Sequence, residues 1–326
     1  MLQSRSAISE AERTVNSKIQ TERAQRIQAL AFDYDKQPKE AVERCNLCGG
    51  DYFVQISQRD RYGYAASAFA CGRCGLVFLN PRLTAEAYGE FYTGVYRPLV
   101  SAYHGRTIDA RSIQTEQLKY AIERAEFAAP YLQAETKPRL LLDIGGSTGV
   151  VAQHFVERFG YAGTVLDPSA EELTEAAGRG LKTVQGLFEL VGFGEKKYDL
   201  VLLCQTIDHL LDIALTLDKI HDRLAGDGFF FVDIVDFRAG YLRNWSVSKT
   251  TKIDHPYYLT QGVIEAYLRC KGFKVLRKGY AADHLHISYL CGLAEPETGA
   301  LPAASGVDDL LCEIRTVQNA PQGGVP

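Results

Sequence analysis

The sequence has no long hydrophobic run, no marked excess of one charge and no leader-like segment at its start. Its longest apolar stretches, such as 200–204 and 229–232, are far shorter than the roughly 20 residues that cross a bilayer, so no membrane partner is expected. With 36 Lys and Arg against 40 Asp and Glu, the net charge is −4, which argues against a protein that coats nucleic acid. The first 30 residues are mostly polar and lack the apolar core of a secretory signal, so we expect a cytoplasmic protein.

Hydrophobic residues make up 46% of the 326 positions, which is enough for a sizeable core. From Arg139 onward, short hydrophobic strands alternate with helical segments. This alternation predicts an α/β fold with a doubly wound, Rossmann-like parallel sheet. The expected strands are 140–144, 163–166, 181–184, 198–204, 228–235, 273–275 and 287–293, and the expected helices are 150–159, 170–177, 211–224 and 261–271. Only a loop separates the last two strands, so they should pair antiparallel at one edge of the sheet.

The pattern divides the chain into five segments. Residues 1–40 form a polar helical extension that opens with the capping-box signature Ser9-x-x-Glu12. Residues 41–85 are a small cysteine-bearing module, 86–137 a tyrosine-rich connector with an amphipathic helix, 138–294 the α/β domain, and 295–326 a tail with a short helix. The connector helix is expected to bury Leu118, Ala121, Ile122, Ala125 and Leu132. The tail helix carries an apolar face that should dock on this chain or on a second copy in a homo-oligomer; that face consists of Val307, Leu310, Leu311, Ile314 and Val317.

Four of the eight cysteines form two matched C-x2-C pairs. Cys45 and Cys48 make the first pair, Cys71 and Cys74 the second, and 22 residues lie between the pairs. Two such pairs supply the four thiolates of a tetrahedral Zn²⁺ site, and the segments 52–56 and 68–71 are expected to form a hairpin that closes it. A redox role is the alternative, but a catalytic C-x-x-C opens a helix after a strand. Four thiolates leave no ligand position for water, so the predicted zinc is structural.

A glycine turn follows the first expected strand of the α/β domain. Asp143 ends that strand, and Gly145, Gly146 and Gly149 shape the turn into the next helix, where backbone can approach a ligand closely. The second strand ends at Asp167, at the place where a carboxylate accepts both ribose hydroxyls of a nucleoside. These features predict a nucleoside-bearing cofactor. The other interpretation of Asp167 is a helix cap ahead of Pro168 and Ser169.

The glycines fall as G-G-S-T-G and do not match the G-x-G-x-x-G of dinucleotide sites. The turn, the acid on the second strand and the Asp208-His209 end of the fourth strand instead resemble class I S-adenosylmethionine-dependent methyltransferases, whose pattern D-x-G-x-G-x-G has Ser147 at its middle glycine here. The resemblance implies S-adenosylmethionine as cofactor. It places the methionine and ribose against the turn, the adenine beside Leu187 or Phe188, and the methionine part near Gln205.

A second resemblance covers the module and the loop after the fifth strand. Cys71-Gly-Arg-Cys74 with Asn80-Pro81-Arg82 is similar to bacterial methyltransferases that carry an N-terminal zinc module and act largely on sugars. Among them, the sugar C-methyltransferases carry an acid–histidine pair followed by aromatic residues, which Asp254-His255-Pro-Tyr257-Tyr258 matches with Asp in place of Glu. We do not expect the additional C-terminal α/β domain of those enzymes, and the sugar and the methylated atom stay open.

The resemblance implies roles for five side chains. His255 would remove a proton from a sugar carbon next to a ketone or from a hydroxyl, because its pKa is ordinarily near neutrality. Asp254 would orient the loop or the imidazole, and Tyr92 and Tyr96 would contact the sugar or a developing enolate. His209 is either catalytic or packed beside a helix-capping Asp208. The expected substrate is a small sugar, linked to a nucleotide.

Two alternatives from other classes stay open. An RNA methyltransferase could grip RNA with the zinc module, because residues 44–82 carry five Arg against two Asp, a net charge of +3, with tyrosines between them. The acidic remainder of the chain disfavours this nucleic-acid partner. A noncatalytic zinc-bearing scaffold is the other alternative, and the intact acids Asp143 and Asp167 argue against it.

Overall fold

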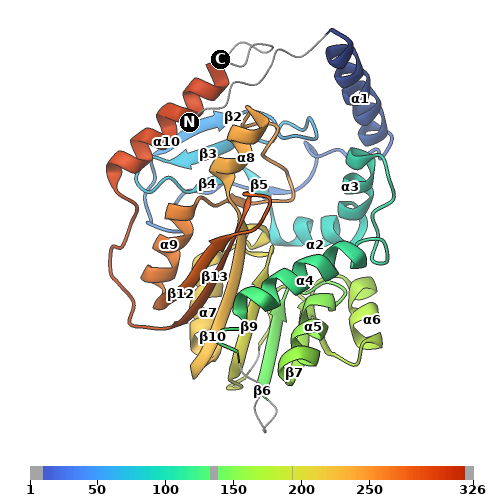
Figure 1. Cartoon of the computed structure of the whole chain (residues 1–326). Helices are drawn as coiled ribbons and strands as arrows, with labels where there is room; N and C mark the ends of the chain where they lie inside the picture. The colour runs from blue at the N-terminus through green and yellow to red at the C-terminus, as the bar shows by residue number, and fades with distance from the viewer. Residues whose placement is uncertain (1–9, 133–138, 193, 320–326) are drawn as a thin grey trace.

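The described residues form two larger sheets, one central and one at the cysteine module, and one small two-stranded sheet (Figure 1). This computed structural model describes residues 10–132, 139–192 and 194–319, and for residues 10–16 the backbone alone. The capping-box signature that begins at Ser9 lies outside the described residues.

The central sheet has seven strands in the order β12-β13-β10-β9-β6-β7-β8, and β13 runs antiparallel to both of its neighbours. The five strands from β10 to β8 pair in parallel. This confirms the predicted doubly wound sheet and its antiparallel edge pair. The strands are β6 (Arg139–Ile144), β7 (Tyr161–Asp167), β8 (Lys182–Gln185), β9 (Tyr198–Cys204), β10 (Leu224–Val235), β12 (Phe273–Tyr280) and β13 (His286–Leu293).

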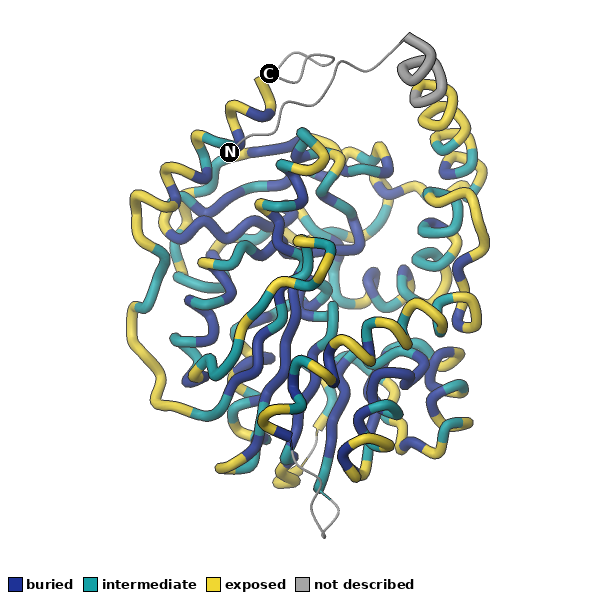
Figure 2. The backbone as a smooth tube through the Cα atoms, viewed as in Figure 1, coloured by how far each residue is buried: buried dark blue, intermediate teal, exposed yellow. Residues whose placement is uncertain are grey.

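Helices cover both faces of the central sheet. One face packs against α4 (Gln114–Ala128), α5 (Val150–Phe159) and α6 (Ala170–Gly178), and the other against α7 (Ile213–Arg223) and α9 (Gln261–Cys270). Side chains of neighbouring residues on one strand pack on opposite faces of the sheet. Leu141 packs with α5, and Leu142 packs with α7. Figure 2 shows the result, buried strands between helices whose outer sides are exposed.

The chain order reverses between β6 and β9, which lie side by side at the centre of the sheet. From β6 the chain continues outward through β7 to β8, whereas from β9 it continues the other way to β10. In open parallel sheets, a crevice forms at such a switch point, outside the carboxyl ends of the strands. The glycine turn follows β6, so it lies at this crevice.

The cysteine module forms a four-stranded antiparallel sheet in the order β11-β4-β3-β2. β2 (Phe53–Ser57) and β3 (Ala68–Cys71) pair as the hairpin that the sequence predicts, and β4 (Val77–Leu79) follows. The fourth strand, β11 (Tyr257–Tyr258), comes from the loop that carries Asp254 and His255. The module therefore shares a sheet with that loop. A separate two-stranded pair joins β1 (Lys39–Glu40) to β5 (Arg82–Leu83).

The tyrosine-rich part of the connector, ahead of the expected amphipathic helix, is helical as well, which the sequence did not lead us to expect. It forms α2 (Ala85–Gly94), capped by Thr84, whose hydroxyl accepts from the backbone N of Ala87, and α3 (Tyr96–His104). The expected burial of Leu118 and Ile122 on α4 is wrong, since both side chains are exposed. Ala121 and Ala125 are buried as expected, because α4 packs closely on α5 through small residues, and Leu132 is buried beyond the end of the helix.

The two terminal helices lie against the rest of this chain. On α10 (Ala304–Asn319), Val307 and Leu310 pack over Gly75 of the module, and Glu313 pairs with Arg238 of α8 (Phe237–Asn244) at 2.6 Å. The apolar face of the tail thus docks on its own chain. On α1 (Glu10–Gln28), Arg23 and Arg26 donate to backbone carbonyls of α3.

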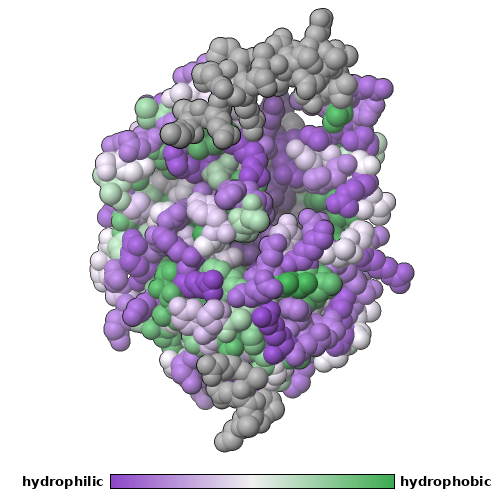
Figure 3. Space-filling view, viewed as in Figure 1, coloured by the Kyte–Doolittle hydropathy of each residue, from purple (hydrophilic) through white to green (hydrophobic). Residues whose placement is uncertain are grey.

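The face seen in Figure 3 is mainly hydrophilic, with hydrophobic side chains in scattered patches. Within the described part of the chain, no helix combines the length and the apolar content needed to cross a bilayer.

Candidate active site

A cavity of about 570 Å³ lies at the carboxyl ends of β6, β7 and β9. It brings together nearly every residue that the sequence predicts for cofactor and substrate. Its lining includes Asp143, Gly145, Gly146, Asp167, Leu187, Phe188 and Gln205, and also Tyr92, Tyr96, His209, Asp254 and His255. Gly149 is not part of the lining: it precedes α5, and a Cβ there would lie 2.6 Å from a methyl of Leu181.

The glycine turn leaves no room for side chains. Gly145 has a φ of +68°, and a Cβ there would lie 2.4 Å from a side-chain carbon of Thr206. A Cβ on Gly146 would lie 2.7 Å from the carboxylate of Asp143. Both positions are therefore restricted to glycine, and the backbone of the turn stays open to a ligand on the cavity side.

Asp143 is a buried acid without a protein partner. Its exposed fraction is 1%, and neither carboxylate oxygen has a hydrogen bond to any described residue. Burial raises the pKa of this carboxyl to about 7, although the charge of Arg124 acts in the opposite direction. An unpartnered buried carboxylate beside the turn suits the cationic methionine end of S-adenosylmethionine.

Asp167 lines the cavity and is not the cap of the next helix, since Ser169 is the N-cap of α6 and its hydroxyl accepts from the backbone N of Glu172. Oδ1 of Asp167 accepts from the backbone N of Ser169 at the start of α6, and its Oδ2 accepts from that of Ser147 in the glycine turn, both at 2.9 Å. Burial, and then the charge of Glu172, raise the pKa of Asp167 to about 7. Each carboxylate oxygen can accept more than one hydrogen bond, so both oxygens can still serve ribose hydroxyls.

Phe188 and Gln205 both line the cavity, one after β8 and the other after β9. Phe188 follows β8 and is buried, as an adenine-contacting ring requires. Gln205 follows β9, and its backbone N donates to Oδ1 of Asp233 at 2.6 Å, while Arg124 pairs with Oδ2 of the same acid at 2.6 Å. The side-chain Nε2 of Gln205 is buried and has no partner among the described residues, so it can donate to a ligand.

His255 is paired with Asp208 rather than with the adjacent Asp254. Its Nδ1 lies 2.7 Å from Oδ2 of Asp208, whereas its Nε2 lies 3.4 Å from Oδ2 of Asp254. A carboxylate only accepts hydrogen bonds, so Nδ1 carries a proton, and in the neutral imidazole the lone pair is on Nε2. Burial alone would raise the pKa of Asp208, but the interaction with His255 keeps it well below its usual range.

Lys252 is a functional residue that sequence reasoning missed. Its Nζ lies 2.6 Å from Nε2 of His255 and 3.7 Å from Oδ2 of Asp254. Burial lowers the pKa of Lys252, and the charge of Asp254 acts in the opposite direction. Burial would raise the pKa of Asp254, but Lys252 and His255 lower it to about 2. Lys252 and Asp254 lie in a turn in which the backbone N of His255 donates to the oxygen of Lys252 at 3.1 Å, so no periodic pattern of the sequence signals their proximity.

Tyr92 fixes the tautomer of His209. The Tyr92 hydroxyl donates to the backbone oxygen of Asp254 at 2.9 Å, so it accepts from Nδ1 of His209 at 2.8 Å. Burial and the neighbouring His255, whose ring centroid lies 4.2 Å away, lower the pKa of His209 to about 4. His209 is therefore neutral at pH 7. Tyr96 packs edge-on against Tyr92 at 5.5 Å.

The cysteine module holds the loop that carries these groups. Buried Asp60 accepts from the backbone N of Ile253 at 3.0 Å, and the backbone N of Arg61 donates to the oxygen of Thr251 at 2.9 Å. The backbone N of Leu79 donates to the oxygen of Pro256 at 2.9 Å. The module thus fixes the loop on both sides of Asp254 and His255.

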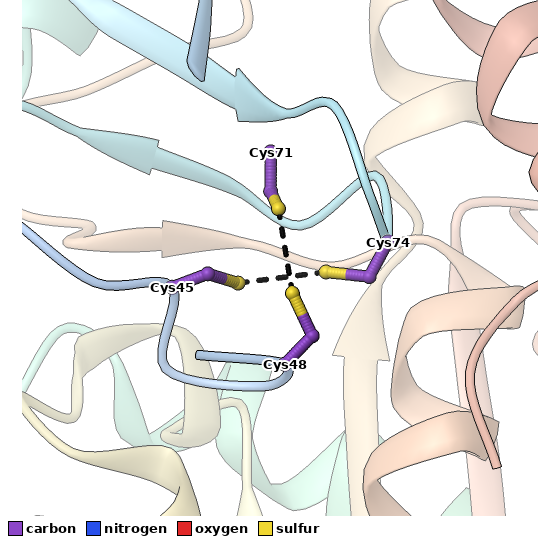
Figure 4. A group of neighbouring side chains, drawn as sticks. All are labelled: Cys45, Cys48, Cys71 and Cys74. Carbon is purple, nitrogen blue, oxygen red and sulfur yellow. Dashed lines mark hydrogen bonds between the residues drawn. The ribbon is translucent and has the colours of Figure 1, made fainter. Parts of the chain in front are cut away.

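The four predicted cysteines converge within the module (Figure 4). Sγ of Cys45 lies 3.5 Å from that of Cys74, and Sγ of Cys48 lies 3.5 Å from that of Cys71. All four sulfurs lie within 4.8 Å of one another. A tetrahedral site with Zn–S bonds of about 2.3 Å separates its sulfurs by about 3.8 Å, so this donor set fits a zinc ion.

Several solved structures are similar to part of this chain at low sequence identity. Among solved structures, the CcbJ methyltransferase from Streptomyces caelestis is 16% identical with a TM-score of 0.43, over 54% of this chain and 90% of that one. The glycopeptide N-methyltransferase MtfA in complex with sinefungin is 14% identical with a TM-score of 0.43, over 53% and 93%. The PH0226 protein from Pyrococcus horikoshii OT3 is 16% identical with a TM-score of 0.44, over 53% and 90%.

A comparison with curated proteins finds no match. The sequence profile of one family, described as "Methyltransferase domain", matches residues 113–278, just over half of the chain. That range contains the glycine turn, Asp143, Asp167, the Asp208–His255 pair and most of the central sheet. The chain therefore belongs to the methyltransferase-domain family and is an S-adenosylmethionine-dependent methyltransferase.

Proposed function

We propose that this enzyme methylates a sugar, linked to a nucleotide, in the cytoplasm. The observation that carries the proposal is the Asp208–His255 pair, which opens into the same cavity as the glycine turn. Methyl transfer is an in-line displacement, so the protein must chiefly position the nucleophile, exclude water and accept a proton. S-adenosylmethionine supplies the electrophilic methyl group, and its sulfonium leaves as a thioether.

His255 is the proton acceptor in this proposal. Asp208 holds the proton on Nδ1, so the proton from a carbon next to a ketone, or from a hydroxyl, goes to Nε2. The electron pair left on that carbon or oxygen then forms the bond to the methyl group. In the structure Lys252 donates to this same lone pair, so the substrate must displace that hydrogen bond before Nε2 can take up its proton. The displaced ammonium then lies beside the negative charge that develops when the proton leaves.

The cavity wall around the histidines supports a sugar as substrate. Tyr62, Tyr92, Tyr96 and His209 present hydroxyl and imidazole groups there. Such groups bind the hydroxyls of a small polyol better than they bind an apolar substrate. Tyr96 has no hydrogen-bond role elsewhere in the described structure that would compete with a sugar hydroxyl.

We also propose that the four cysteines bind a structural zinc ion. The spacing of their sulfurs and their closed, four-thiolate donor set support this assignment. Asp60 accepts a hydrogen bond from the histidine loop and the backbone N of Leu79 donates one to it, so the role of the zinc module in this proposal is to position His255.

The arrangement of the arginines favours a sugar over RNA. In the module, Arg44 pairs with Asp51 at 3.2 Å, and Arg82 pairs with Glu40 at 2.8 Å. Arg61 lines the cavity. The five arginines therefore do not form one open basic face of the kind that grips single-stranded RNA. A noncatalytic scaffold is unsupported as well, because the family match and the cavity belong to an enzyme.

The proposal is tested by following a labelled methyl group. The purified protein is incubated with methyl-labelled S-adenosylmethionine and separate pools of nucleotide sugars, RNA and protein. We expect label on the nucleotide sugars. Label on RNA or protein, and none on any sugar, would contradict the proposal.

A further inference from the structure

One end of the cavity is basic. We call the cavity-lining side chains Arg61, His104 and Arg106 the basic end. The guanidinium carbon of Arg61 lies 4.2 Å from the ring centroid of Tyr103 and 5.1 Å from that of Tyr62. Arg61 follows Asp60 in the cysteine module, whereas His104 and Arg106 lie at the end of α3 and just after it. Two distant parts of the chain thus meet at this end.

Arg61 forms no ion pair with a described residue, although the more distant charge of Asp254 raises the pKa of its guanidinium. Among the described residues, no carboxylate lies within 4.0 Å of its guanidinium, and its Nε is buried without a hydrogen bond. The hydroxyl of Tyr62, whose residue is 6% exposed, is also buried without a hydrogen bond. A half-buried cation beside an unpartnered hydroxyl is costly unless an anion completes the site.

The neighbouring groups increase this need for an anion. Burial lowers the pKa of His104, and the charges of Arg61 and Arg106 lower it further, so these two guanidinium groups place positive charge around the imidazole and disfavour its protonation. Arg106 has only a distant partner, Glu116 at 4.0 Å, and both side chains are largely exposed. An anion bound between these side chains would offset that positive charge.

Two acids, Asp143 and Asp167, line the same cavity beside the glycine turn, where the cofactor is expected. S-adenosylmethionine carries a cationic sulfonium and a cationic amino group, so these acids suit the cofactor. The basic end is adjacent to the histidine loop, because the backbone N of Arg61 donates to the oxygen of Thr251, one residue before Lys252. A substrate that reacts near His255 can therefore place a charged group at the basic end.

We propose that Arg61, His104 and Arg106 bind a phosphate group of the substrate, so that the methylated sugar is a phosphate ester. This inference rests on the proposed sugar methyltransferase activity and adds a carrier-binding site to it. Arg61 and Tyr62 donate to the phosphate oxygens from the module, and Arg106 donates from the α3 side. The sugar attached to the phosphate then lies toward His209 and His255.

The test measures binding of UDP, inorganic pyrophosphate and uridine to the full chain by calorimetry, with S-adenosylhomocysteine present. We expect UDP to bind and uridine to bind far more weakly. The Arg61→Met variant keeps the apolar stem over Tyr103 and removes the charge, and it should weaken UDP binding at least about tenfold, the loss of one charge-assisted hydrogen bond. Binding of pyrophosphate as well would show recognition of the phosphates alone, and binding of UDP alone would show a nucleoside diphosphate carrier.

Two further variants control the interpretation. Arg44→Met removes the same charge from the same module, at an exposed position paired with Asp51, and should bind UDP like the wild type. Arg106→Met should weaken UDP binding in the same direction as Arg61→Met. Unchanged affinity for S-adenosylhomocysteine shows that each variant is folded.

The outcomes separate this site from the proposed activity. If UDP binds no better than uridine, or Arg61→Met binds UDP as tightly as the wild type, the phosphate site is wrong even where a sugar is methylated. If UDP binding depends on Arg61 but no nucleotide sugar accepts a methyl group, the phosphate site stands and the sugar assignment fails.

Discussion

Nδ1 of His255 donates to Oδ2 of Asp208 across 2.7 Å, although the two residues belong to distant parts of the chain. Asp208 lies in a short 3-10 helix after β9 (η1, Ile207–His209), on the central sheet. His255 lies on a loop that the cysteine module holds through Asp60. The pair therefore joins the cofactor domain to the module, and its geometry depends on both.

The His255→Gln variant tests the proton acceptor. Glutamine cannot take up a proton, so kcat should fall by about 10²- to 10⁴-fold, the usual contribution of a general base. The affinity for S-adenosylhomocysteine should stay the same, because His255 lies away from the glycine turn. Kinetics and calorimetry check the two quantities, and a large loss of cofactor affinity would show that the role of His255 is misassigned.

The Asp208→Asn variant should also lower kcat. Its amide can donate to Nδ1, which moves the imidazole proton to Nε2 and removes the accepting lone pair. Asp218→Asn is the matched control, because Asp218 forms an exposed ion pair with Lys271 outside the cavity. If the Asp208→Asn variant has the same kcat as the wild type, Asp208 has no part in orienting His255.

Cofactor binding should depend on pH through Asp143. Its pKa is raised to about 7 in the folded protein, so the carboxyl is protonated below that pH in the free enzyme. The protonated carboxyl contributes to the free energy of unfolding. This contribution is complete below the pKa that Asp143 has in the unfolded chain, and it is lost as the pH rises through 7. A cationic ligand favours the ionised form, so binding below pH 7 must release a proton.

S-adenosylhomocysteine should therefore bind more weakly at pH 6 than at pH 8, by up to about tenfold per pH unit below the pKa. Calorimetry in buffers of different ionisation enthalpy measures both the affinity and the proton release. The Asp143→Asn variant should bind more weakly and lose most of the pH dependence. A flat profile in the wild type would contradict a contact between Asp143 and the cofactor.

The Gly145→Ala variant tests the glycine turn. Its Cβ would lie 2.4 Å from Thr206, and the residue has a φ of +68°. Gly160→Ala is the matched control, because Gly160 has a φ of +76° but no atom within 4 Å of an added Cβ. Both variants should lose about 1 kcal/mol to backbone strain. Only Gly145→Ala should also lose affinity for S-adenosylhomocysteine, at least about tenfold. Equal affinity in the two variants would contradict a role of the glycine turn in cofactor binding.

Removal of zinc should release the histidine loop. We expect one zinc ion per chain by elemental analysis, and chelation or Cys71→Ser should lower both the melting temperature and kcat. The affinity for S-adenosylhomocysteine should change much less, since the glycine turn lies outside the module. Cys312→Ser, at an exposed lone cysteine, should leave all of these quantities unchanged. Full kcat in the zinc-free protein would contradict the positioning role.

The α/β domain was predictable because hydrophobic spacing alone determines its elements. The strand at 198–204 and the helix at 150–159 have the predicted bounds, since each is a regular apolar pattern next to a glycine or a charge. The connector helices α2 and α3 were missed, although their tyrosines recur at intervals of four and seven residues, which is a helical spacing. Leu118 and Ile122 were misassigned because their burial depends on how closely α4 approaches α5.

The sequence predicted most of the residues that line the candidate site, but it did not predict which of them pair with one another. Asp254-His255 forms a local motif, and a local motif suggests that the two side chains act together. The structure instead pairs His255 with Asp208 and Lys252, because the fold brings the end of β9 to the loop before β11. Arg61 counted in the sequence as part of a basic surface, and only the packing of the module on α3 places it at the cavity.

The central claim, methyl transfer to a sugar with His255 as proton acceptor, is tested most directly by mass spectrometry of products. Nucleotide sugars with and without a 4-keto group are incubated with S-adenosylmethionine and either the wild type or His255→Gln. We predict the gain of one methyl group on a nucleotide sugar with the wild type and almost none with the variant, and a gain that requires the ketone identifies carbon as the methylated atom. No methyl gain on any nucleotide sugar, or an equal gain with the variant, would contradict the account.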